Sequence, residues 1–386
     1  MKKCFKEKIK AFWSKFIQDE AYIRKLIDNT DEIDKAYDYI NDLLNIAFEE
    51  IYFEIGVNDE KKYELILTPE GSREKLFLLY EWYIRSNEEL KDKWNFYYTR
   101  PRIKEGENFN INMYDINLIY EDVYIIPEID FEQKRVNLKV YCEKLTTLNE
   151  TERYNLFFIL LDMYISEIYS MDFIGYIDFY EKSKDNILKK IELERNNISK
   201  DEFDMLIEEE KEDDAGNQYL NYELNVEIFE KISISMNKLK SYIDEVINQN
   251  KWKDYENPFD RFYSYHMQPS TESDYDMRED VIAGACLDIS IINEYYNYSD
   301  KMYNRNYENG VVYGFLFFEN ININQNEVIS VRINIEDEIV SLIEEHGIGK
   351  LIGGATGFYY SYMDFIIFDF KEFLKISKIV LNKRSE

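Results

Sequence analysis

The sequence predicts an α+β protein with tandem ββαβ units, a helical connector and a C-terminal α/β sandwich. Hydrophobic residues make up 45% and aromatic residues 16% of the 386 residues, enough to build several packed cores. With only 13 Gly and 5 Pro, the chain does not have the composition of a loop-dominated or fibrous protein. Stretches with strand periodicity alternate with stretches of helical periodicity. We therefore expect N-terminal helices (1–50), a duplicated ββαβ domain (51–181), a connector (182–257) and a C-terminal domain (258–386).

The N-terminal region is predicted to form two helices, the second from about Glu32 to Glu49. In the first, apolar side chains recur at helical spacing, with lysines on the opposite face. The stripe consists of Phe5, Ile9, Phe12, Trp13 and Phe16. A basic amphipathic helix can lie on a membrane surface, so membrane binding through residues 5–17 is the alternative. We prefer the interpretation in which the stripe packs onto a neighbouring domain.

The region 51–181 contains one order of elements twice, about 75 residues apart. The first unit has strands Ile51–Gly56 and Tyr63–Thr68, helix Arg73–Ser86 with Ser72 as its N-cap, and strand Trp94–Thr99. The second has strands Val123–Ile126 and Val136–Cys142, helix Thr151–Tyr169 and strand Phe173–Tyr180. The spacing indicates a duplication, or a single sheet assembled from both units.

The connector and the C-terminal domain differ in character. In the connector, Asp185–Arg195 and Val226–Asn250 have helical periodicity. Between them, residues 201–214 hold nine acidic residues and one lysine, which is typical of a solvated loop. The alternative is an acidic segment that attracts a basic partner. The C-terminal domain alternates strands and helices and ends in a hairpin and a helix, an order that favours a ferredoxin-like sandwich. Its expected elements are strands Phe262–Met267 and Val281–Cys286, helix Ser290–Asn306, strand Val311–Phe318, helix Ile333–His346, hairpin Lys350–Gly354/Tyr359–Phe368 and helix Phe370–Leu381.

The charge and the rare residue types exclude several functions. With 77 acidic against 47 basic residues the formal charge is −30, which disfavours nucleic-acid binding and favours solubility or a basic partner. Two histidines and three widely spaced cysteines predict no metal site, no cofactor and no disulfide framework. Together with the lack of a signal peptide or a long apolar run, they predict a cytoplasmic location.

A glycine-rich stretch, residues 346–357, is the most conspicuous local feature. It is not a phosphate loop, because Lys350 is followed by Leu351 and the segment leads into a strand rather than a helix. We expect Gly353, Gly354 and Gly357 to supply positive φ angles in a hairpin turn or bulge. The alternative is a bare backbone that a ligand or peptide approaches closely.

Candidate polar residues cluster in the C-terminal domain. Asp364 lies in a strand that is apolar on both faces, so we expect a core aspartate bonded by a tyrosine hydroxyl or a backbone N–H; a general base is the alternative. His266 could act as a base oriented by Asp280, but no nucleophile elbow accompanies them. A hydrolytic or small-molecule site would bring His266, Arg278, Asp280 and Asp364 together near the glycine hairpin. At the end of the first ββαβ unit, Arg100 and Arg102 form a small basic site that we expect to pair with surface carboxylates; contact with an anion or a carboxylate peptide is the alternative.

Several segments resemble a family of uncharacterised bacterial cytosolic proteins. They are Phe53-Glu54-Ile55-Gly56, Thr68-Pro69-Glu70-Gly71, Trp94-Asn95-Phe96, Arg100-Pro101-Arg102, Ala283-Gly284, Ile292-Asn293-Glu294-Tyr295-Tyr296, Gly353-Gly354-Ala355-Thr356-Gly357 and Tyr362-Met363-Asp364-Phe365. The C-terminal domain is also similar to the ferredoxin-like regulators of ribonuclease E. These resemblances imply α+β domains in the cytoplasm and bring no catalytic residues with them.

The sequence therefore favours a non-enzymatic interaction or regulatory protein, such as an immunity protein. It would bind a basic protein partner through an acidic, Tyr-rich surface. The candidate contact residues are those named above together with Asn293, Glu294 and Tyr362. The alternative is a small-molecule-binding or hydrolytic protein with a cleft between the repeat domain and the C-terminal domain.

Overall fold

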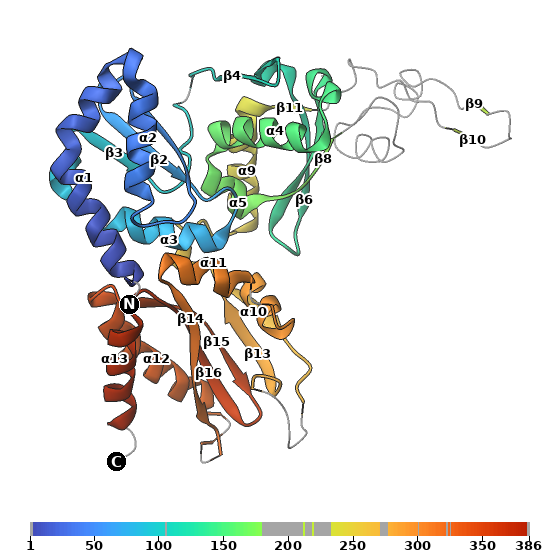
Figure 1. The fold of residues 1–386 in the computed structure, drawn as a ribbon. Helices are drawn as coiled ribbons and strands as arrows, with labels where there is room; N and C mark the ends of the chain where they lie inside the picture. Colours follow the sequence, from blue (N-terminus) through green and yellow to red (C-terminus); the bar gives the residue numbers. More distant parts are fainter. Residues whose placement is uncertain are drawn as a thin grey trace. The chain divides into compact units, whose positions relative to one another are not determined.

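The fold is α+β, and a computed structural model describes most of the chain (Figure 1). The described residues are 3–104, 106–179, 211–212, 218–219, 233–270, 277–299, 301–321, 323–324 and 326–383. They form two compact units. Met1–Tyr98 and Tyr255–Glu386 make up the discontinuous unit, and Thr99–Asp254 make up the inserted unit. This division differs from the predicted boundaries, because the first ββαβ stretch shares its core with the C-terminal domain rather than with the second stretch.

The N-terminal helices of the discontinuous unit are α1 (Phe5–Asp28) and α2 (Ile33–Leu44), joined by a 3₁₀ turn (Thr30–Glu32). Every residue of the predicted apolar stripe is buried in the unit's core. Trp13 stacks on Trp82 with ring centroids 5.0 Å apart, and Phe16 meets the edge of Trp94 at 5.1 Å. In this fold the apolar face of α1 is covered by the core of the unit, as in the preferred interpretation.

The first sheet has three strands, β1 (Tyr52–Val57), β2 (Tyr63–Thr68) and β3 (Trp94–Tyr97). β1 and β2 are antiparallel; helix α3 (Arg73–Ile84) and a 3₁₀ turn (Glu88–Leu90) lead to β3, which runs parallel to β2. Asn58 builds the β1–β2 turn, because its side-chain oxygen accepts from the N–H groups of Glu60 and Lys62, both at 3.0 Å. Ser72 caps α3 as predicted, accepting from Lys75 N–H at 3.3 Å.

The second sheet of this unit has five antiparallel strands in the order β12-β13-β15-β16-β14. They are β12 (Tyr263–His266), β13 (Val281–Cys286), β14 (Val312–Glu319), β15 (Gly349–Gly357) and β16 (Tyr360–Ile367). The helices are α10 (Ile289–Tyr296), α11 (Lys301–Asn309), α12 (Val328–Glu345) and α13 (Phe370–Asn382), after a 3₁₀ turn at Pro258–Asp260. The predicted helix Ser290–Asn306 is therefore two helices.

The two faces of this sheet have different neighbours. Met363, Phe365 and Ile367 pack with α12 and α13 in one cluster. Tyr362 and Asp364 point to the opposite face, since side chains alternate along a strand. From β14 to α13 the element order is β-α-β-β-α, but the described chain has no strand after α13, where a ferredoxin-like domain has its last strand. The predicted ferredoxin-like arrangement is matched only in that part.

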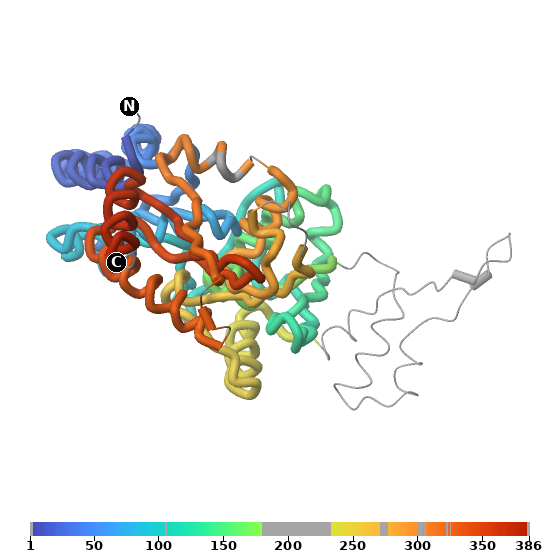
Figure 2. The backbone as a smooth tube through the Cα atoms, turned by 90° about the horizontal axis from the view of Figure 1, so that it is seen from below, coloured from blue at the N-terminus to red at the C-terminus, as the bar shows by residue number. Residues whose placement is uncertain are grey.

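The start of α1 contacts the C-terminal part of the chain, and in Figure 2 the blue N-terminal helix begins beside orange and red segments. Phe5 N–H donates to the carbonyl of Gly310 at 3.0 Å, and Lys6 N–H donates to the carbonyl of Phe368 at 3.2 Å. Phe5 and Phe368 also lie 5.5 Å apart between ring centroids. The start of α1 is thereby fixed to the beginning of β14 and the end of β16.

The inserted unit contains a mixed four-stranded sheet in the order β11-β6-β7-β8. Its elements are β4 (Asn110–Met113), β5 (Ile116–Ile119), β6 (Tyr124–Asp130), β7 (Arg135–Tyr141), α4 (Glu150–Ile165), α5 (Glu167–Phe173), β8 (Ile174–Phe179), β9 (Lys211–Glu212), β10 (Gln218–Tyr219), β11 (Ile234–Ser235) and α9 (Met236–Asn250), with 3₁₀ turns at Tyr120–Asp122 and Glu143–Thr147. β6 and β7 are antiparallel and β7 and β8 are parallel, so the two predicted ββαβ stretches lie in separate sheets. That they arose by duplication stays a prediction.

The predicted connector (182–257) is only partly described. Its C-terminal helix, α9, packs Leu239, Ile243 and Val246 into the core of the inserted unit, and β11 pairs with β6. This half belongs to a domain core and is not a connector. The predicted helix Asp185–Arg195 and nearly all of the acidic stretch 201–214 lie outside the described residues.

Candidate functional site

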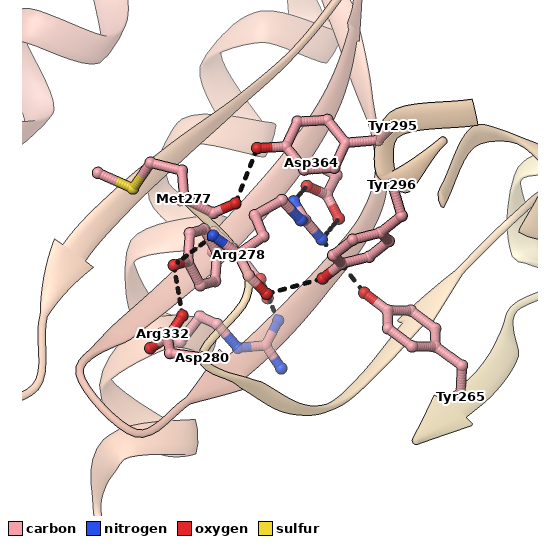
Figure 3. Close-up of polar contacts among 10 residues, drawn as sticks. Tyr265, Met277, Arg278, Asp280, Tyr295, Tyr296, Arg332 and Asp364 are labelled. Carbon is pink, nitrogen blue, oxygen red and sulfur yellow. Dashed lines mark hydrogen bonds and ion pairs between the residues drawn. The ribbon is translucent and has the colours of Figure 1, made fainter. Parts of the chain in front are cut away.

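The candidate site is a buried polar cluster on the face of the five-stranded sheet that carries Tyr362 and Asp364 (Figure 3). β16 positions these two side chains, since both have even numbers on one extended strand. The segment before β13 contributes Arg278 and Asp280, which contact Asp364 and Tyr362. Arg278, Asp280 and Asp364 are 2%, 0% and 7% exposed. The structure thus brings together three of the four residues expected near the glycine hairpin.

Arg278 and Asp364 form a two-pronged ion pair. Nη1 of Arg278 donates to Oδ1 of Asp364, and Nη2 donates to Oδ2 at 3.3 Å. Nη2 also donates to the hydroxyl of Tyr265 on β12 at 3.2 Å. Burial lowers the pKa of the guanidinium, but the facing carboxylate outweighs burial, so the pKa of Arg278 is raised and the charge is retained. The prediction of a hydrogen-bonded core aspartate is confirmed, with arginine rather than tyrosine or backbone as its donor.

Aromatic rings surround the same guanidinium. Its central carbon lies 5.0 Å from the ring centroid of Tyr362, 5.1 Å from that of Phe315 and 5.7 Å from that of Tyr295. These distances are in the range of cation–π attraction. Nε of Arg278 is buried and has no hydrogen-bond partner among the described residues.

The backbone of Arg278 is held in an uncommon conformation. Its φ of +73° lies in the left-handed region, which a non-glycine residue adopts only when its surroundings fix it. Tyr296 donates its hydroxyl to the Arg278 carbonyl at 2.7 Å, and Tyr295 donates to the Met277 carbonyl at 2.9 Å. Helix α10 therefore fixes this segment through two tyrosines.

Asp280 closes the β15–β16 hairpin. Its Oδ1 accepts the hydroxyl of Tyr362 at 2.6 Å, and its Oδ2 accepts the N–H groups of Tyr359 and Tyr360 at 2.9 and 3.0 Å. Burial and the bond to Asp280 raise the pKa of Tyr362. The Tyr362 oxygen in turn accepts Arg278 N–H at 3.1 Å. Both oxygens of Asp280 therefore accept hydrogen bonds from the hairpin, so Asp280 holds the fold in place.

The glycines of β15 do not act as predicted. None of Gly353, Gly354 and Gly357 has a positive φ; in this region the left-handed glycine is Gly347, at +57°. Each of the three lies inside the strand, where a Cβ would collide with a neighbour. The colliding atoms are the Ala285 carbonyl oxygen at 2.8 Å for Gly353, Arg332 Nη1 at 1.9 Å for Gly354, and Asp280 Oδ2 at 2.3 Å for Gly357. Their function is to make room for buried backbone and charged groups.

The remaining predicted residues lie outside the cluster. His266 and Asn293 are exposed, and Glu294 is half-buried on α10. Because Asp280 is fully buried and bonded elsewhere, the structure does not form the His266–Asp280 pair. Arg102 is exposed in the inserted unit.

Arg100 belongs to a separate buried cluster in the inserted unit. Its Nη1 lies 3.1 Å from Asp162 Oδ2, and its backbone N–H donates to Glu167 Oε2 at 2.9 Å. Ser170 donates to the other oxygen of Asp162 at 2.7 Å. Burial and the nearby charge of Glu167 raise the pKa of Asp162 to about 7 despite the arginine. Arg100 does pair with a carboxylate, but in a core rather than at the surface.

A partly exposed row of aromatic side chains, here called the aromatic face, adjoins the Arg278 cluster. It consists of Tyr295, Phe315, Phe317 and Tyr360. Successive ring centroids lie 5.9, 6.3 and 5.5 Å apart. Tyr295 and Phe317 are 40% and 44% exposed. Alternation along β14 places the exposed Glu319 on the same side, directly opposite Tyr360 in the strand pairing.

A cavity of about 280 Å³ lies elsewhere in the discontinuous unit. Apolar side chains form much of its wall, with charged and amide groups from the start of α3 and the end of α11. Its lining residues include Phe48, Ile51, Leu78, Glu74, Lys75 and Asn309. It lies between the first ββαβ stretch and the C-terminal part, where the sequence predicted a cleft, but His266, Arg278, Asp280 and Asp364 do not line it.

The sequence pointed to Arg278, Asp280, Asp364 and Tyr362, but not to the other tyrosines that complete the cluster. Tyr265 and Tyr296 gave no signal, since tyrosines are common along the whole chain. In the described parts of the chain no group of three or more His, Cys, Asp or Glu side chains could hold a metal ion. None of the helices that the structure describes is long and apolar enough to cross a bilayer.

Comparisons of the chain with protein-family models, with curated proteins and with solved structures found no match. The resemblances drawn from the sequence stay predictions.

Proposed function

We propose that this protein is a non-enzymatic interaction or regulatory protein that binds a basic protein partner, as an immunity protein would. The contact would be made by the aromatic face and Glu319. The observation that carries the proposal is the combination of exposed rings and an exposed carboxylate on one side of a sheet, in a chain of formal charge −30. Aromatic side chains supply contact area, and the acid excess attracts and orients a basic partner.

Arg278 supports the choice of a cationic partner. Its guanidinium lies against the inner side of the same rings, at 5.1 Å from Phe315 and 5.7 Å from Tyr295. The rings therefore already interact with a guanidinium on their buried side. A partner's arginine or lysine on the exposed side would meet the outer faces of these rings and the carboxylate of Glu319.

The state of the polar cluster supports a non-catalytic role. Each carboxylate oxygen of Asp280 and Asp364 accepts a hydrogen bond from within the fold. A general base must lie within hydrogen-bond reach of a substrate proton, and these two carboxylates are only 0% and 7% exposed. The three cysteines are free thiols, which supports the cytoplasmic location that belongs to this proposal.

The test is binding of a synthetic basic peptide. The probe has eight alternating Arg and Thr residues, the length of β14, with both ends blocked. We expect Phe317→Ala to weaken binding about tenfold, as truncating a central aromatic contact does. We expect Glu319→Gln to weaken binding less and to flatten its dependence on salt.

Matched controls separate this face from the general negative charge. Phe370→Ala removes a ring of similar exposure, 48%, at the start of α13. Glu345→Gln removes an exposed carboxylate at the end of α12. Equal binding by all four variants would mean that the peptide is attracted only by net charge, and the proposal would then be wrong.

The cavity favours a second candidate function, the binding of a small molecule. A volume of about 280 Å³ with an apolar wall and a polar rim accepts a small, partly apolar ligand. Leu78→Trp would fill it from α3. A fragment screen read by the wild-type melting temperature, with loss of any hit in Leu78→Trp, tests this candidate.

A further inference from the structure

The free edge of β14 is a further feature of the five-stranded sheet. β14 is the last strand in the sheet order and, among the described residues, pairs with β16 alone. It is eight residues long, twice the four residues of β12 at the other edge. An edge strand exposes N–H and C=O groups that can accept another strand.

The register identifies which backbone groups face outward. Asn320 N–H donates to the Tyr359 carbonyl at 2.8 Å, and pairing continues without a shift from Glu319↔Tyr360 to Val312↔Ile367. In an antiparallel ladder, residues that bond to the partner strand alternate with residues that do not. Even-numbered residues of β14 therefore bond to β16. Phe315, Phe317 and Glu319 direct their N–H and C=O groups to the open edge.

The same odd-numbered residues contribute side chains to the aromatic face or lie beside it. Phe315 pairs with Asp364 and Phe317 with Tyr362, so their side chains share the face that carries the Arg278 cluster. A strand added at this edge would place its alternate side chains next to Phe315, Phe317 and Glu319. Backbone pairing and side-chain recognition would therefore occur on the same surface.

β14 has none of the usual features that prevent edge pairing. Natural edge strands carry lysine, proline, an inward charge or a bulge. The β14 sequence VYGFLFFE contains no lysine or proline, its pairing with β16 shows no register shift, and its one charge is Glu319 at the end. An apolar edge of this length is costly to leave unprotected, because it invites aggregation.

We propose that β14 accepts an extended segment of a protein partner as an additional strand, with arginine or lysine at alternate positions of that segment. This inference rests on the proposed function and adds the mode of binding. The charge of the edge selects the occupant. An incoming cation opposite Glu319 forms an ion pair, and its neighbours stack on Phe317. A second β14 has no cation to offer Glu319, and two copies of formal charge −30 repel each other.

The test uses two N-methylated versions of the Arg/Thr peptide. One carries methyl groups on the Arg amides and the other on the Thr amides. In an added strand, alternate amides face β14, so methylation of one set removes the hydrogen bonds and methylation of the other does not. We expect one version to lose more than tenfold in affinity and the other to keep the affinity of the unmethylated peptide. Which version loses affinity reports whether the added strand is antiparallel or parallel.

The outcomes separate this inference from the proposed function. Equal binding by both methylated peptides, with binding still sensitive to Phe317→Ala, would overturn strand addition and leave the basic-partner proposal standing. Equal loss in both would also overturn it, since only one set of amides can face the edge. No binding of the unmethylated peptide would contradict the proposed function itself. A chain that dimerises in sedimentation experiments, and stays monomeric after Phe317→Lys, would overturn the choice of occupant in favour of a second copy.

Discussion

Removing Asp364 while keeping Arg278 is expected to destabilise the discontinuous unit severely. At 3.3 Å between Nη2 and Oδ2, and with an effective dielectric constant of about 20, the Coulomb attraction is about 5 kcal/mol. Asp364→Leu leaves a guanidinium that is 2% exposed without a counter-charge. Breaking a buried pair in this way costs about 3–5 kcal/mol of the free energy of unfolding. We expect a loss of that size.

The double variant Arg278→Met/Asp364→Leu decides whether the loss of stability comes from the buried Arg278 charge that is left without a counter-charge. Replacing both partners by apolar residues is often neutral or stabilising, so the double variant should recover most of the stability that the single variant loses. Urea unfolding followed by tryptophan fluorescence is a suitable assay. Three of the four tryptophans, Trp13, Trp82 and Trp94, lie in the core of the discontinuous unit.

An exposed ion pair serves as the control. Lys375→Gln breaks the pair with Glu372 on α13, in which both side chains are largely exposed, and should leave the unfolding midpoint unchanged within error. If the double variant were as unstable as Asp364→Leu, the unpaired charge of Arg278 would not be the cause of the instability. The aromatic packing around Arg278 would then contribute more to stability than its ion pair.

Two further changes probe other parts of the structure. Gly357→Ala places a Cβ 2.3 Å from Asp280 Oδ2 and should cost about 1–3 kcal/mol in urea unfolding, whereas Gly56→Ala, with no atom within 4 Å, should have little effect; equal effects would contradict the spacing role of Gly357. The raised pKa of Asp162, about 7, means that between roughly pH 4 and 7 the folded inserted unit binds more protons than its unfolded form. Its stability should therefore fall as pH rises through that window, by up to about 1.4 kcal/mol per pH unit, and level off above pH 7. Hydrogen exchange of peptides from residues 99–179 measures this slope, and a slope unchanged in Asp162→Asn would show that another group titrates.

Local patterns predicted the elements well, because they depend on neighbours in sequence. Strand β2 (Tyr63–Thr68), the Ser72 cap and strand β13 (Val281–Cys286) lie where periodicity and capping residues placed them. The β4–β5 hairpin (Asn110–Ile119) was missed, since its strands are four residues each and largely polar. Domain boundaries were predicted less well. Nothing local in residues 51–98 shows that part of their core follows residue 254.

The candidate site shows the same limit. Asp364 was predicted to be bonded because an aspartate in an apolar strand needs a donor. The sequence did not identify that donor, since Arg278 lies 86 residues away and is brought in by sheet pairing. The glycines of β15 were misjudged for the same reason. A glycine in a turn and a glycine beside a buried carboxylate look alike until the atoms around the missing Cβ are known.

The discontinuous core has a consequence for synthesis in the cell. When Tyr98 leaves the ribosome, Trp13 and Phe16 already have Trp82 and Trp94 as partners, but Phe5 still lacks Gly310 and Phe368. The whole inserted unit must be translated first, which takes on the order of ten seconds or more at about 5–20 residues per second. The inserted unit can complete its own core in that interval. The nascent N-terminal part meanwhile exposes Phe5 and the other core side chains that later pack with Val311, Ile352 and Phe368, so we expect it to be bound by chaperones until the last strands emerge.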